Sequence, residues 1–371
     1  MTRFGFVIPT YNEAENIGRT IESIALQRSP KGDLISRDSY EIIVADTPGH
    51  DETPRAVAQA AARFDGLRYS VVSEPARSMV AARNTGIGHL LERPSPVDYI
   101  VSGDADTVLP PGWLSAVEEK LAQGATIVST AGFFETELWR RCPTLTRCYI
   151  EEIGTVFFPQ VITDEYVTAQ DRPLFTPQLF RDFGRPVSDC AFVIESETYQ
   201  KLGGFRPEHY DAEGQDEIPA VGWPFMFRAE LAGTDIAYVE EPAYETSARR
   251  LLHEPEALFS GSSYLGEIEN FRSQNDDQYA WLDHFAPRLN MEALRRYVVK
   301  NYVLQQCITR PERIVQNPGA FGSAADELAM VVALWRDAHP QPGAREVFAF
   351  ADELTDRFFD AVVCALEESV L

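Results

Sequence analysis

Positive charge is scarce in this sequence of 371 residues. Its 33 lysines and arginines stand against 57 aspartates and glutamates, and the formal net charge at pH 7 is −24. A surface of this sign repels the phosphates of nucleic acids and of anionic lipid headgroups. We therefore expect neither nucleic acid nor an anionic membrane surface as a partner. Solubility or a salt-rich habitat is the simplest explanation of the excess acid.

Long apolar runs and paired cysteines are missing too. No run of about 18 apolar residues occurs, so the sequence predicts no transmembrane helix. The apolar run at residues 4–9 is too short for a signal peptide. The 5 cysteines form no CxxC pair, and Cys142 and Cys148 are too far apart for the usual zinc spacing. Reduced cysteines are typical of the cytosol, and we expect a cytoplasmic protein.

Strand and helix patterns alternate over the first 130 residues. Apolar strands are predicted at residues 4–9, 40–46, 68–73, 99–103 and 125–130. A first helix is predicted to begin at Asn12, which with Glu15 has the spacing of a capping box. Further helices are predicted at residues 53–64, 78–91 and 111–123. Strands that are apolar on both faces and alternate with helices predict an α/β fold with a mainly parallel sheet.

The pattern is less regular after residue 130. Residues 135–185 show no clear period, a strand is predicted at 190–194, and a helix at 196–202. Residues 216–232 look helical, although Pro219 and Pro224 must bend or break the helix, and a short strand is predicted at 236–239. Amphipathic spacing at 293–306, 324–338 and 344–366 predicts a helical C-terminal extension.

Polar clusters follow the predicted strands where a parallel sheet binds its ligands, at the carboxyl ends. These clusters are residues 9–13, Asp46 and the Asp104-Ala105-Asp106 tripeptide. Positions i and i+2 of a strand share a face, so both carboxylates of the tripeptide can turn toward one ligand. They repel each other unless a cation lies between them, which favours a divalent metal that also binds phosphate. Alone, an Asp-x-Asp tripeptide often occurs by chance, as a loop capped by its own aspartates.

Short motifs in this order resemble those of family 2 glycosyltransferases. They are Val7-Ile8-Pro9-Thr10-Tyr11-Asn12-Glu13, Val44-Ala45-Asp46, Ala82-Arg83-Asn84-Thr85-Gly86, Asp104-Ala105-Asp106 and Lys201-Leu202-Gly203-Gly204-Phe205. The resemblance covers about residues 3–250 and implies a GT-A fold, which is Rossmann-like. It implies a glycosyltransferase domain at 1–255, with a nucleotide-sugar-binding half at 1–130 and an acceptor and catalytic-base half at 131–255. Residues 256–371 would form the helical extension.

The resemblance also implies roles for the residues that bind the donor. Asp46 would accept a hydrogen bond from the base, and Arg83 and Asn84 would fix the pyrophosphate or brace the Asp104 loop. The wall that receives base and ribose would contain Pro9, Thr10, Tyr11 and Glu13, and the loop at Ala105 would lie beside it. Helix capping is an equally good reading of Glu13. Arg249 and Arg250 would clamp a diphosphate or an anionic acceptor, or form salt bridges with nearby acids.

Asp106 is the metal ligand that the resemblance favours, and Asp104 would complete the site or hold the ribose. Both Mg²⁺ and Mn²⁺ suit carboxylate and phosphate oxygens. His253 is a further candidate ligand. Asp216 would be the general base, with Glu217 next and Asp211 and Glu213 behind them. The family's usual acid before this aspartate is replaced here by Gln215.

Together these features predict an inverting, metal-dependent transfer of a sugar from a UDP-, GDP- or dTDP-sugar to an acceptor hydroxyl. The acceptor is not readable from the sequence, and a homodimer is possible. One alternative is a nucleotide-sugar-binding or scaffold protein with a degenerate site. Another is a sugar-phosphate nucleotidyltransferase, which would carry a glycine-rich loop after its first strand, where this chain has residues 9–13.

Overall fold

The structure is a computed structural model, and it describes residues 4–152, 179, 182–218, 220–253, 255 and 276–370. By their contacts the residues group into two compact units. The first unit contains Met1–Gly132 and Pro186–Thr246, and the second contains Phe133–Arg185 and Ser247–Leu371. This grouping joins residues 133–185 to the C-terminal residues. The functional division predicted at residue 255 stays a prediction.

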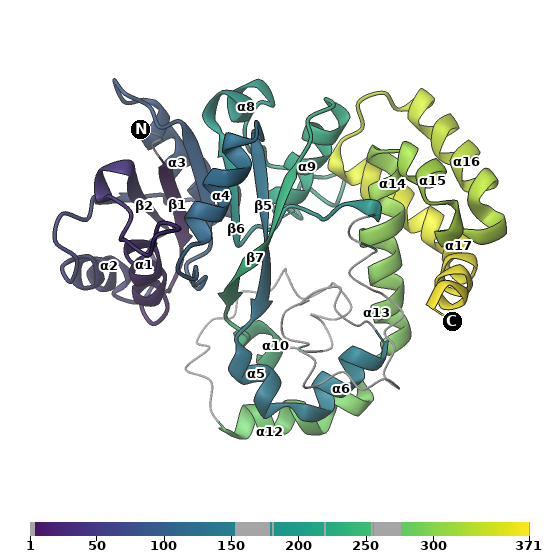
Figure 1. Ribbon diagram of the computed structural model, residues 1–371, viewed down its shortest axis with the longest axis horizontal. Coiled ribbons are helices and arrows are strands. Elements are labelled where there is room, and N and C mark those ends of the chain that lie inside the picture. The colour runs from purple at the N-terminus through teal and green to yellow at the C-terminus, as the bar shows by residue number, and fades with distance from the viewer. Residues whose placement is uncertain are drawn as a thin grey trace. The chain divides into compact units, whose positions relative to one another are not determined.

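The first unit is built on a sheet whose strands have the order β3-β2-β1-β4-β6-β5-β7 (Figure 1). β1 pairs in parallel with β2 and β4, β2 pairs in parallel with β3, and β6 is antiparallel to both β4 and β5. The strands are β1 (Phe4–Thr10), β2 (Tyr40–Asp46), β3 (Tyr69–Ser73), β4 (Tyr99–Gly103), β5 (Ile127–Phe134), β6 (Ala191–Glu195) and β7 (Ala237–Thr246). The predicted mainly parallel sheet is confirmed.

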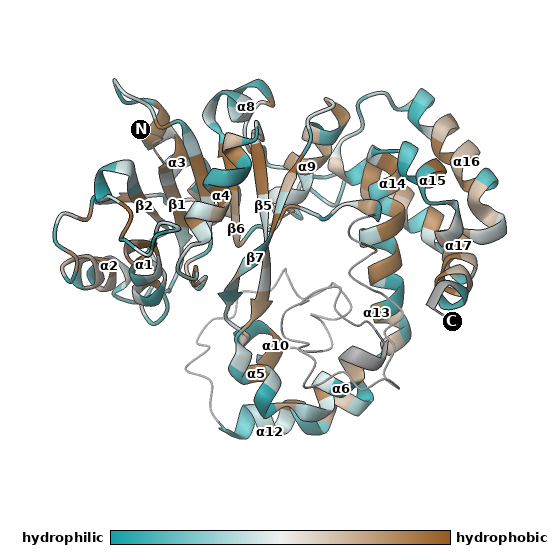
Figure 2. Cartoon of the chain, viewed as in Figure 1, coloured by the Kyte–Doolittle hydropathy of each residue, from teal (hydrophilic) through white to brown (hydrophobic). Residues whose placement is uncertain are grey.

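Helices cover both faces of this sheet. Alternate residues of β1 point to opposite sides, so the strand presents apolar side chains to helices on each face. Phe4, Phe6 and Ile8 join a buried cluster that contains residues of α1 and α4. On the other side α3 packs against β1 and β2. Figure 2 shows the resulting apolar strands, in brown, between helices of mixed hydropathy. The helices are α1 (Ile17–Ala25), η1 (Arg37–Ser39), α2 (Thr53–Ala61), α3 (Met79–Leu91), α4 (Trp113–Ala122), α8 (Ser196–Lys201) and α9 (Gly222–Leu231).

The predicted helix start at Asn12 is wrong. α1 begins at Ile17, and Asn12 has a φ of 55°, in the left-handed region that asparagine tolerates better than most residues. Its side-chain Oδ1 accepts a hydrogen bond from the backbone N of His50 at 2.8 Å. The asparagine therefore joins the loop after β1 to the loop after β2, and no capping box with Glu15 forms.

The predicted helix at residues 216–232 is shorter than expected. α9 begins at Gly222, and Asp216 and Glu217 lie in the loop before it. In this loop His209 and Glu217 form an antiparallel bridge, and Tyr210 N donates to the carbonyl of Asp216 at 2.8 Å. A proline at position 219 disfavours a helical conformation in the residue before it, which fits a helix that starts later.

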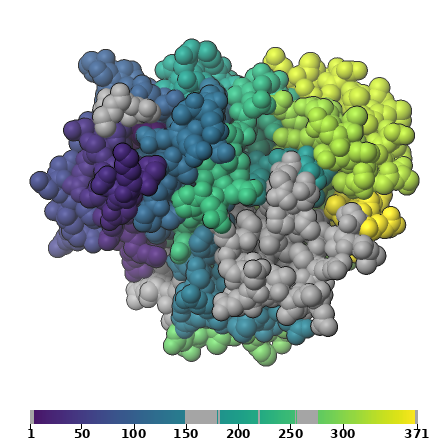
Figure 3. Space-filling model, viewed as in Figure 1, coloured from purple at the N-terminus to yellow at the C-terminus, as the bar shows by residue number. Residues whose placement is uncertain are grey.

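Apart from the end of β5 at residues 133–134, the regular structure in the described part of the second unit is helical, which confirms the predicted C-terminal helices and adds helices at 136–152. None of the described helices is both long and apolar enough to cross a membrane. Residues of the last helices, yellow-green to yellow, are exposed in Figure 3. The elements are α5 (Thr136–Arg141), α6 (Pro143–Glu152), α10 (Arg249–His253), α12 (Asp276–Phe285), η3 (Ala286–Arg288), α13 (Met291–Val298), the π-helical η4 (Val299–Leu304), α14 (Gln305–Thr309), α15 (Glu312–Gln316), η5 (Pro318–Ala320), η6 (Gly322–Ala324), α16 (Ala325–Ala338) and α17 (Ala344–Val370).

Candidate functional site

The carboxyl ends of β1 and β2 bring Thr10 and Asp46 together. The two residues are register partners, and Thr10 Oγ1 donates to Asp46 Oδ1 at 2.7 Å. Burial raises the pKa of the Asp46 carboxyl, the hydrogen bond from Thr10 opposes this shift, and the charge of Asp51 adds to it. The predicted base-binding carboxylate is thus fixed in orientation at the edge of the sheet.

The loop that follows β1 is held by the start of α2. Glu13 N donates to Thr53 Oγ1 at 2.9 Å, and Ala14 N donates to Asp51 Oδ2 at 2.8 Å. Thr53 Oγ1 donates in turn to Asp51 Oδ1 at 2.6 Å. No motif marks Asp51 in the sequence, and its only local signal is its position before a helix start. The Glu13 side chain is buried and accepts from Asn16 Nδ2 at 3.0 Å, so it orders the same loop.

The guanidinium group of Arg77 lies over the aromatic ring of Tyr11. The guanidinium carbon of Arg77 lies 4.7 Å from the ring centroid, and Arg77 also donates to the Tyr11 hydroxyl. A cation over an aromatic face is attracted by the ring quadrupole. Arg77 therefore lies beside the ring that the resemblance assigns to the nucleotide.

Arg83 donates a hydrogen bond to the loop that contains Asp104. Its side chain is 1% exposed, and its Nη2 donates to Asp104 Oδ1 at 2.6 Å and to the carbonyl of Asp189 at 3.2 Å. Asp104 N donates to the carbonyl of Cys190 at 3.2 Å, which ties the loop to the start of β6. Of the two roles predicted for Arg83, bracing the loop is the one that these contacts make. Pyrophosphate binding stays a prediction.

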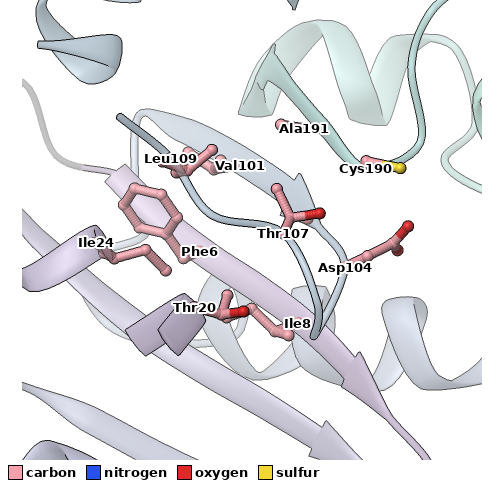
Figure 4. Close-up of a pocket in the computed structure, with 11 residues that line it drawn as sticks. Phe6, Ile8, Thr20, Ile24, Val101, Asp104, Thr107, Leu109, Cys190 and Ala191 are labelled. Atoms are coloured by element: carbon pink, nitrogen blue, oxygen red, sulfur yellow. The ribbon is translucent and has the colours of Figure 1, made fainter. Parts of the chain in front are cut away.

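The rest of this loop is anchored on three sides. The Ala105 carbonyl accepts from Thr20 Oγ1 at 2.6 Å, and Val108 exchanges backbone hydrogen bonds with Glu245. Asp106 is half-buried, and its Oδ1 lies 3.5 Å from Thr246 Oγ1, at the end of β7. Figure 4 shows the small pocket below the loop, which Asp104 and Thr107 line together with apolar residues of β1, β4 and α1.

Asp104 and Asp106 fit a divalent cation that takes most of its ligands from phosphate and water. The described residues hold no cluster of three or more histidine, cysteine or acidic side chains suited to a metal. One Asp104 oxygen is already engaged by Arg83. A site with one or two carboxylates plus substrate phosphates is typical of Mg²⁺. His253, Arg249 and Arg250 belong to the second compact unit, and their predicted roles stay predictions.

The loop before α9 positions the predicted base. Asp211 accepts hydrogen bonds from the backbone N of Gln215 and of Asp216, and these bonds hold the pKa of Asp211 below its usual range. Glu217 Oε1 accepts from Ser78 Oγ at 2.6 Å. Ser78 is the N-cap of α3, since its Oγ also accepts from Ala81 N. Glu217 is therefore bonded to the helix that carries Arg83, whereas the Asp216 carboxylate accepts no hydrogen bond within the described residues.

Asn84 supports the Gly-Gly-Phe turn. Its Nδ2 donates to the carbonyl of Phe205 at 3.1 Å, and its Oδ1 accepts from the Tyr199 hydroxyl at 2.9 Å. Arg228 reaches the same turn, where it donates to the carbonyl of Gly204 at 2.6 Å and pairs with Glu208. Both side chains thus link the motif residues to one another, and the predicted contact of Asn84 with pyrophosphate stays a prediction.

Asp189 is a carboxylate that the sequence analysis did not single out. Its Oδ1 accepts a hydrogen bond from Gly222 N, at the first residue of α9. Burial raises the pKa of the Asp189 carboxyl to about 7, the charge of Arg83 acts against this shift, and the charge of Asp104 acts with it. Asp189 lies two residues before β6 and belongs to no recognisable motif, so no local signal marks it.

A mainly parallel α/β sheet with carboxylates at its carboxyl edge defines this unit. Residues 6–166 match the model of the family described as Glycosyl transferase family 2. The family resemblance read from the motifs is confirmed over this part of the chain. The match includes Asp46, Arg83 and the Asp104–Asp106 tripeptide, and it ends before Asp216.

Individual proteins that are similar to this chain match it over a short segment or at low sequence identity. Glycosyltransferase AglE of Haloferax volcanii is 37% identical over 81 residues, which cover 22% of this chain and 24% of that relative. Among solved structures, mannosyltransferase PcManGT from Pyrobaculum calidifontis, in complex with GDP-Man and Mn²⁺, has 16% identity and a TM-score of 0.45 over 99% of this chain and 86% of its own. Glucosyl-3-phosphoglycerate synthase from Mycobacterium tuberculosis, with Mn²⁺, UDP and glucosyl-3-phosphoglycerate, has 15% identity and a TM-score of 0.38 over 79% of this chain and 80% of its own.

Proposed function

We propose that this chain transfers a sugar from a nucleoside diphosphate sugar to an acceptor hydroxyl, with inversion at the anomeric carbon. The observation that carries the proposal is the carboxyl edge of the sheet. There Asp104 and Asp106 follow β4, in a sheet where the Thr10–Asp46 pair ends β1 and β2. The match of residues 6–166 to a glycosyltransferase family supports the same activity.

The donor would lie along this edge. Asp46 accepts a hydrogen bond from an N–H group of the base, and the ring of Tyr11 flanks it. Asp104 and Asp106 would hold a divalent cation, Mg²⁺ or Mn²⁺, which would supply positive charge against the leaving diphosphate. The bond from Arg83 keeps the Asp104 carboxylate in one orientation. The donor is a UDP-, GDP- or dTDP-sugar, and the acceptor is a hydroxyl compound not yet identified.

Asp216 is the general base in this proposal. Its carboxylate accepts no hydrogen bond in the described part of the chain, so it is available to a hydroxyl proton, whereas Glu217 already accepts from Ser78. Asp216 removes the proton of the acceptor hydroxyl as that oxygen attacks the anomeric carbon and the diphosphate leaves from the opposite side. Such a single displacement inverts the configuration at the anomeric carbon.

A cytoplasmic location and a homodimer, both predicted from the sequence, remain part of the proposal.

The test is slow hydrolysis of sugar nucleotides by the isolated protein in the presence of Mn²⁺. We expect one donor of a UDP-, GDP- and dTDP-sugar panel to be hydrolysed, and the sugar first released, followed by NMR, to have inverted configuration. Asp106→Ala should abolish hydrolysis and weaken Mn²⁺-dependent nucleotide binding in calorimetry. Asp216→Asn should keep the nucleotide affinity and lower turnover by roughly 10²- to 10⁴-fold.

A nucleotide-sugar-binding scaffold is the second candidate, because Gln215 replaces the family's usual acid and Arg83 already engages one Asp104 oxygen. That function predicts nucleotide binding without turnover and without dependence on Mn²⁺.

The variant Glu217→Gln is compared with Asp216→Asn to identify the general base. If Glu217→Gln removes turnover and Asp216→Asn does not, the role of base passes to Glu217.

A further inference from the structure

Asp189 lies at the junction of the two loops that the proposed function uses. β6 runs antiparallel to β4 with Ala191 opposite Gly103, so the residues before β6 meet the loop that follows β4. Asp104 N donates to the carbonyl of Cys190, and Arg83 Nη2 bonds both Asp104 Oδ1 and the carbonyl of Asp189. One buried guanidinium therefore fixes the two aspartates relative to each other.

The orientation of the Asp189 carboxylate is fixed as well. Its Oδ1 accepts a hydrogen bond from the backbone N–H of Gly222. This N–H lies in the first turn of α9, where N–H groups have no partner inside the helix, at the positive end of the helix dipole. A Cβ atom on residue 222 would lie 2.7 Å from Asp189 Oδ1 and 3.0 Å from the carbonyl of Val187, so only glycine leaves room for this contact. The second carboxylate oxygen of Asp189 makes no hydrogen bond in the described residues.

Asp189 lies beside the Asp104 loop and at the start of α9, the helix that follows the loop of Asp216. Burial raises the pKa of the Asp189 carboxyl, and the charge of Asp104 adds to this shift. Burial also raises the pKa of the Tyr210 phenol, and the charges of Asp216 and Asp189 add to it. The sugar in transfer must lie between the diphosphate, which Asp104 and Asp106 would hold, and the acceptor hydroxyl, which Asp216 would deprotonate. Asp189, linked through Arg83 to Asp104 and bonded directly to the start of α9, is the candidate for contact with that sugar.

We propose that Asp189 is a specificity-determining residue, whose second carboxylate oxygen accepts hydrogen bonds from hydroxyl groups of the transferred sugar. This inference rests on the proposed function. A hydrogen bond from a hydroxyl to a fixed carboxylate is strong. A sugar that presents no hydroxyl there leaves the carboxylate desolvated and without a partner, and the site rejects it. Asp189 therefore selects among epimers of the donor sugar and leaves the nucleotide unaffected.

The experiment compares nucleoside diphosphate and sugar nucleotide on the same variants. Isothermal titration at pH 8 with Mn²⁺ gives the Kd of UDP and GDP, and of the glucose, galactose, N-acetylglucosamine and mannose derivatives of the nucleotide that binds. We expect Asp189→Asn and Asp189→Ala to reduce the preference for the best sugar over the other sugars of the panel by roughly 10-fold or more, the value of a hydrogen bond to a charged group. The Kd of the nucleoside diphosphate alone should change by less than about 2-fold.

Two further variants separate recognition from structure. Gly222→Ala keeps the charge but displaces the carboxylate, and it should reduce the same preference. Glu118→Gln removes a half-buried carboxylate on α4 and should change neither quantity. Equal weakening of nucleoside diphosphate and sugar nucleotide by Asp189→Asn would overturn the inference, as would an unchanged preference among sugars. If the wild-type protein binds no sugar nucleotide, the proposed function itself fails, which is a separate result.

Discussion

Arg83 shows how a single residue sets the geometry of the candidate site. The side chain is buried, although a guanidinium is always charged, and its Nε and Nη1 have no hydrogen-bond partner within the described residues. Burying such a group is costly unless it is paired, and removing one partner of a buried pair costs more than the pair contributes. The contacts that Arg83 does make hold Asp104 and the Asp189 carbonyl in position.

The raised pKa of Asp189 predicts a pH-dependent stability. Because its pKa is about 7 in the folded state and 3.8 in the reference state, the folded protein binds a proton that the unfolded chain has lost. The free energy of unfolding contributed by this group therefore falls as the pH rises from about 4 to about 7, and it is constant outside that window. Asp189→Asn should remove this contribution, so the difference in stability between variant and wild type should change across the window.

Urea unfolding from pH 4.5 to pH 8.5 in buffer without divalent cations measures that difference. Asp65→Asn, which removes an exposed acid, is the matched control and should give a curve parallel to the wild type. A curve for Asp189→Asn that is also parallel to the wild type would contradict the assignment of the shifted pKa to this residue.

The positions of candidate site residues in the fold were predictable where a motif or a strand end marks them. Asp46, Asp104 and Asp106 follow apolar strands, and parallel pairing is enough to bring them to one edge. Asp51 and Asp189 were not predictable, because their roles arise from partners far along the chain, 37 residues away for the bond between Ala14 and Asp51. The same holds for Asn12, whose left-handed conformation depends on the distant His50.

At the scale of elements, α3 connects the strands β1 and β2 with the loop before α9. Its N-cap Ser78 bonds Glu217, and its second and third turns carry Arg83 and Gly86. The helix packs against β1 and β2, with Gly86 against Val7. A shift of α3 would therefore move Arg83 and the loop before α9 together.

The close packing of α3 on β1 gives a prediction with a control on the same helix. A Cβ atom on Gly86 would lie 2.5 Å from Val7 Cγ1, so Gly86→Ala should destabilise the protein by roughly 1–3 kcal/mol through overpacking. Gly88 has no atom nearer than 3.9 Å to such a Cβ, so Gly88→Ala should be neutral or stabilise by roughly 0.5–1 kcal/mol through helix propensity. Chemical denaturation of both variants measures this, and equal effects would show that the helix does not contact β1 as closely as described.

The elements themselves were largely predictable, and their ends less so. The strand at Tyr40–Asp46 and the helix that follows Ser78 agree with the sequence patterns, since apolar runs and an N-cap serine are local signals. β7 extends to Thr246, beyond the predicted end at residue 239. Its later residues include Glu240, Glu241 and Pro242, which do not read as a strand. The bridge between Val108 and Glu245 is a distant contact that a local pattern does not contain.

For the whole molecule, the dominant physical property is its charge of −24. Some acids are compensated, as on α17, where Asp356 pairs with Arg296 and Asp352 with Lys300. With 57 acids and 33 basic residues, full compensation is impossible. Self-repulsion of this kind keeps a protein soluble and destabilises its compact state.

Salt is therefore expected to stabilise this protein, because the Debye length falls from about 10 Å at 0.1 M to about 3 Å at 1 M and screens the repulsion. The melting temperature, measured by calorimetry between roughly 0.05 and 1 M KCl, should rise with salt. The double variant Glu353→Gln/Asp360→Asn removes two exposed acids of α17 and should melt higher than the wild type at low salt, with a smaller salt dependence. Asp356→Asn also removes one negative charge from α17 but breaks the ion pair with Arg296, so it should show no such gain. A melting temperature that does not depend on salt in the wild type would mean that repulsion among surface carboxylates does not limit the stability of the fold.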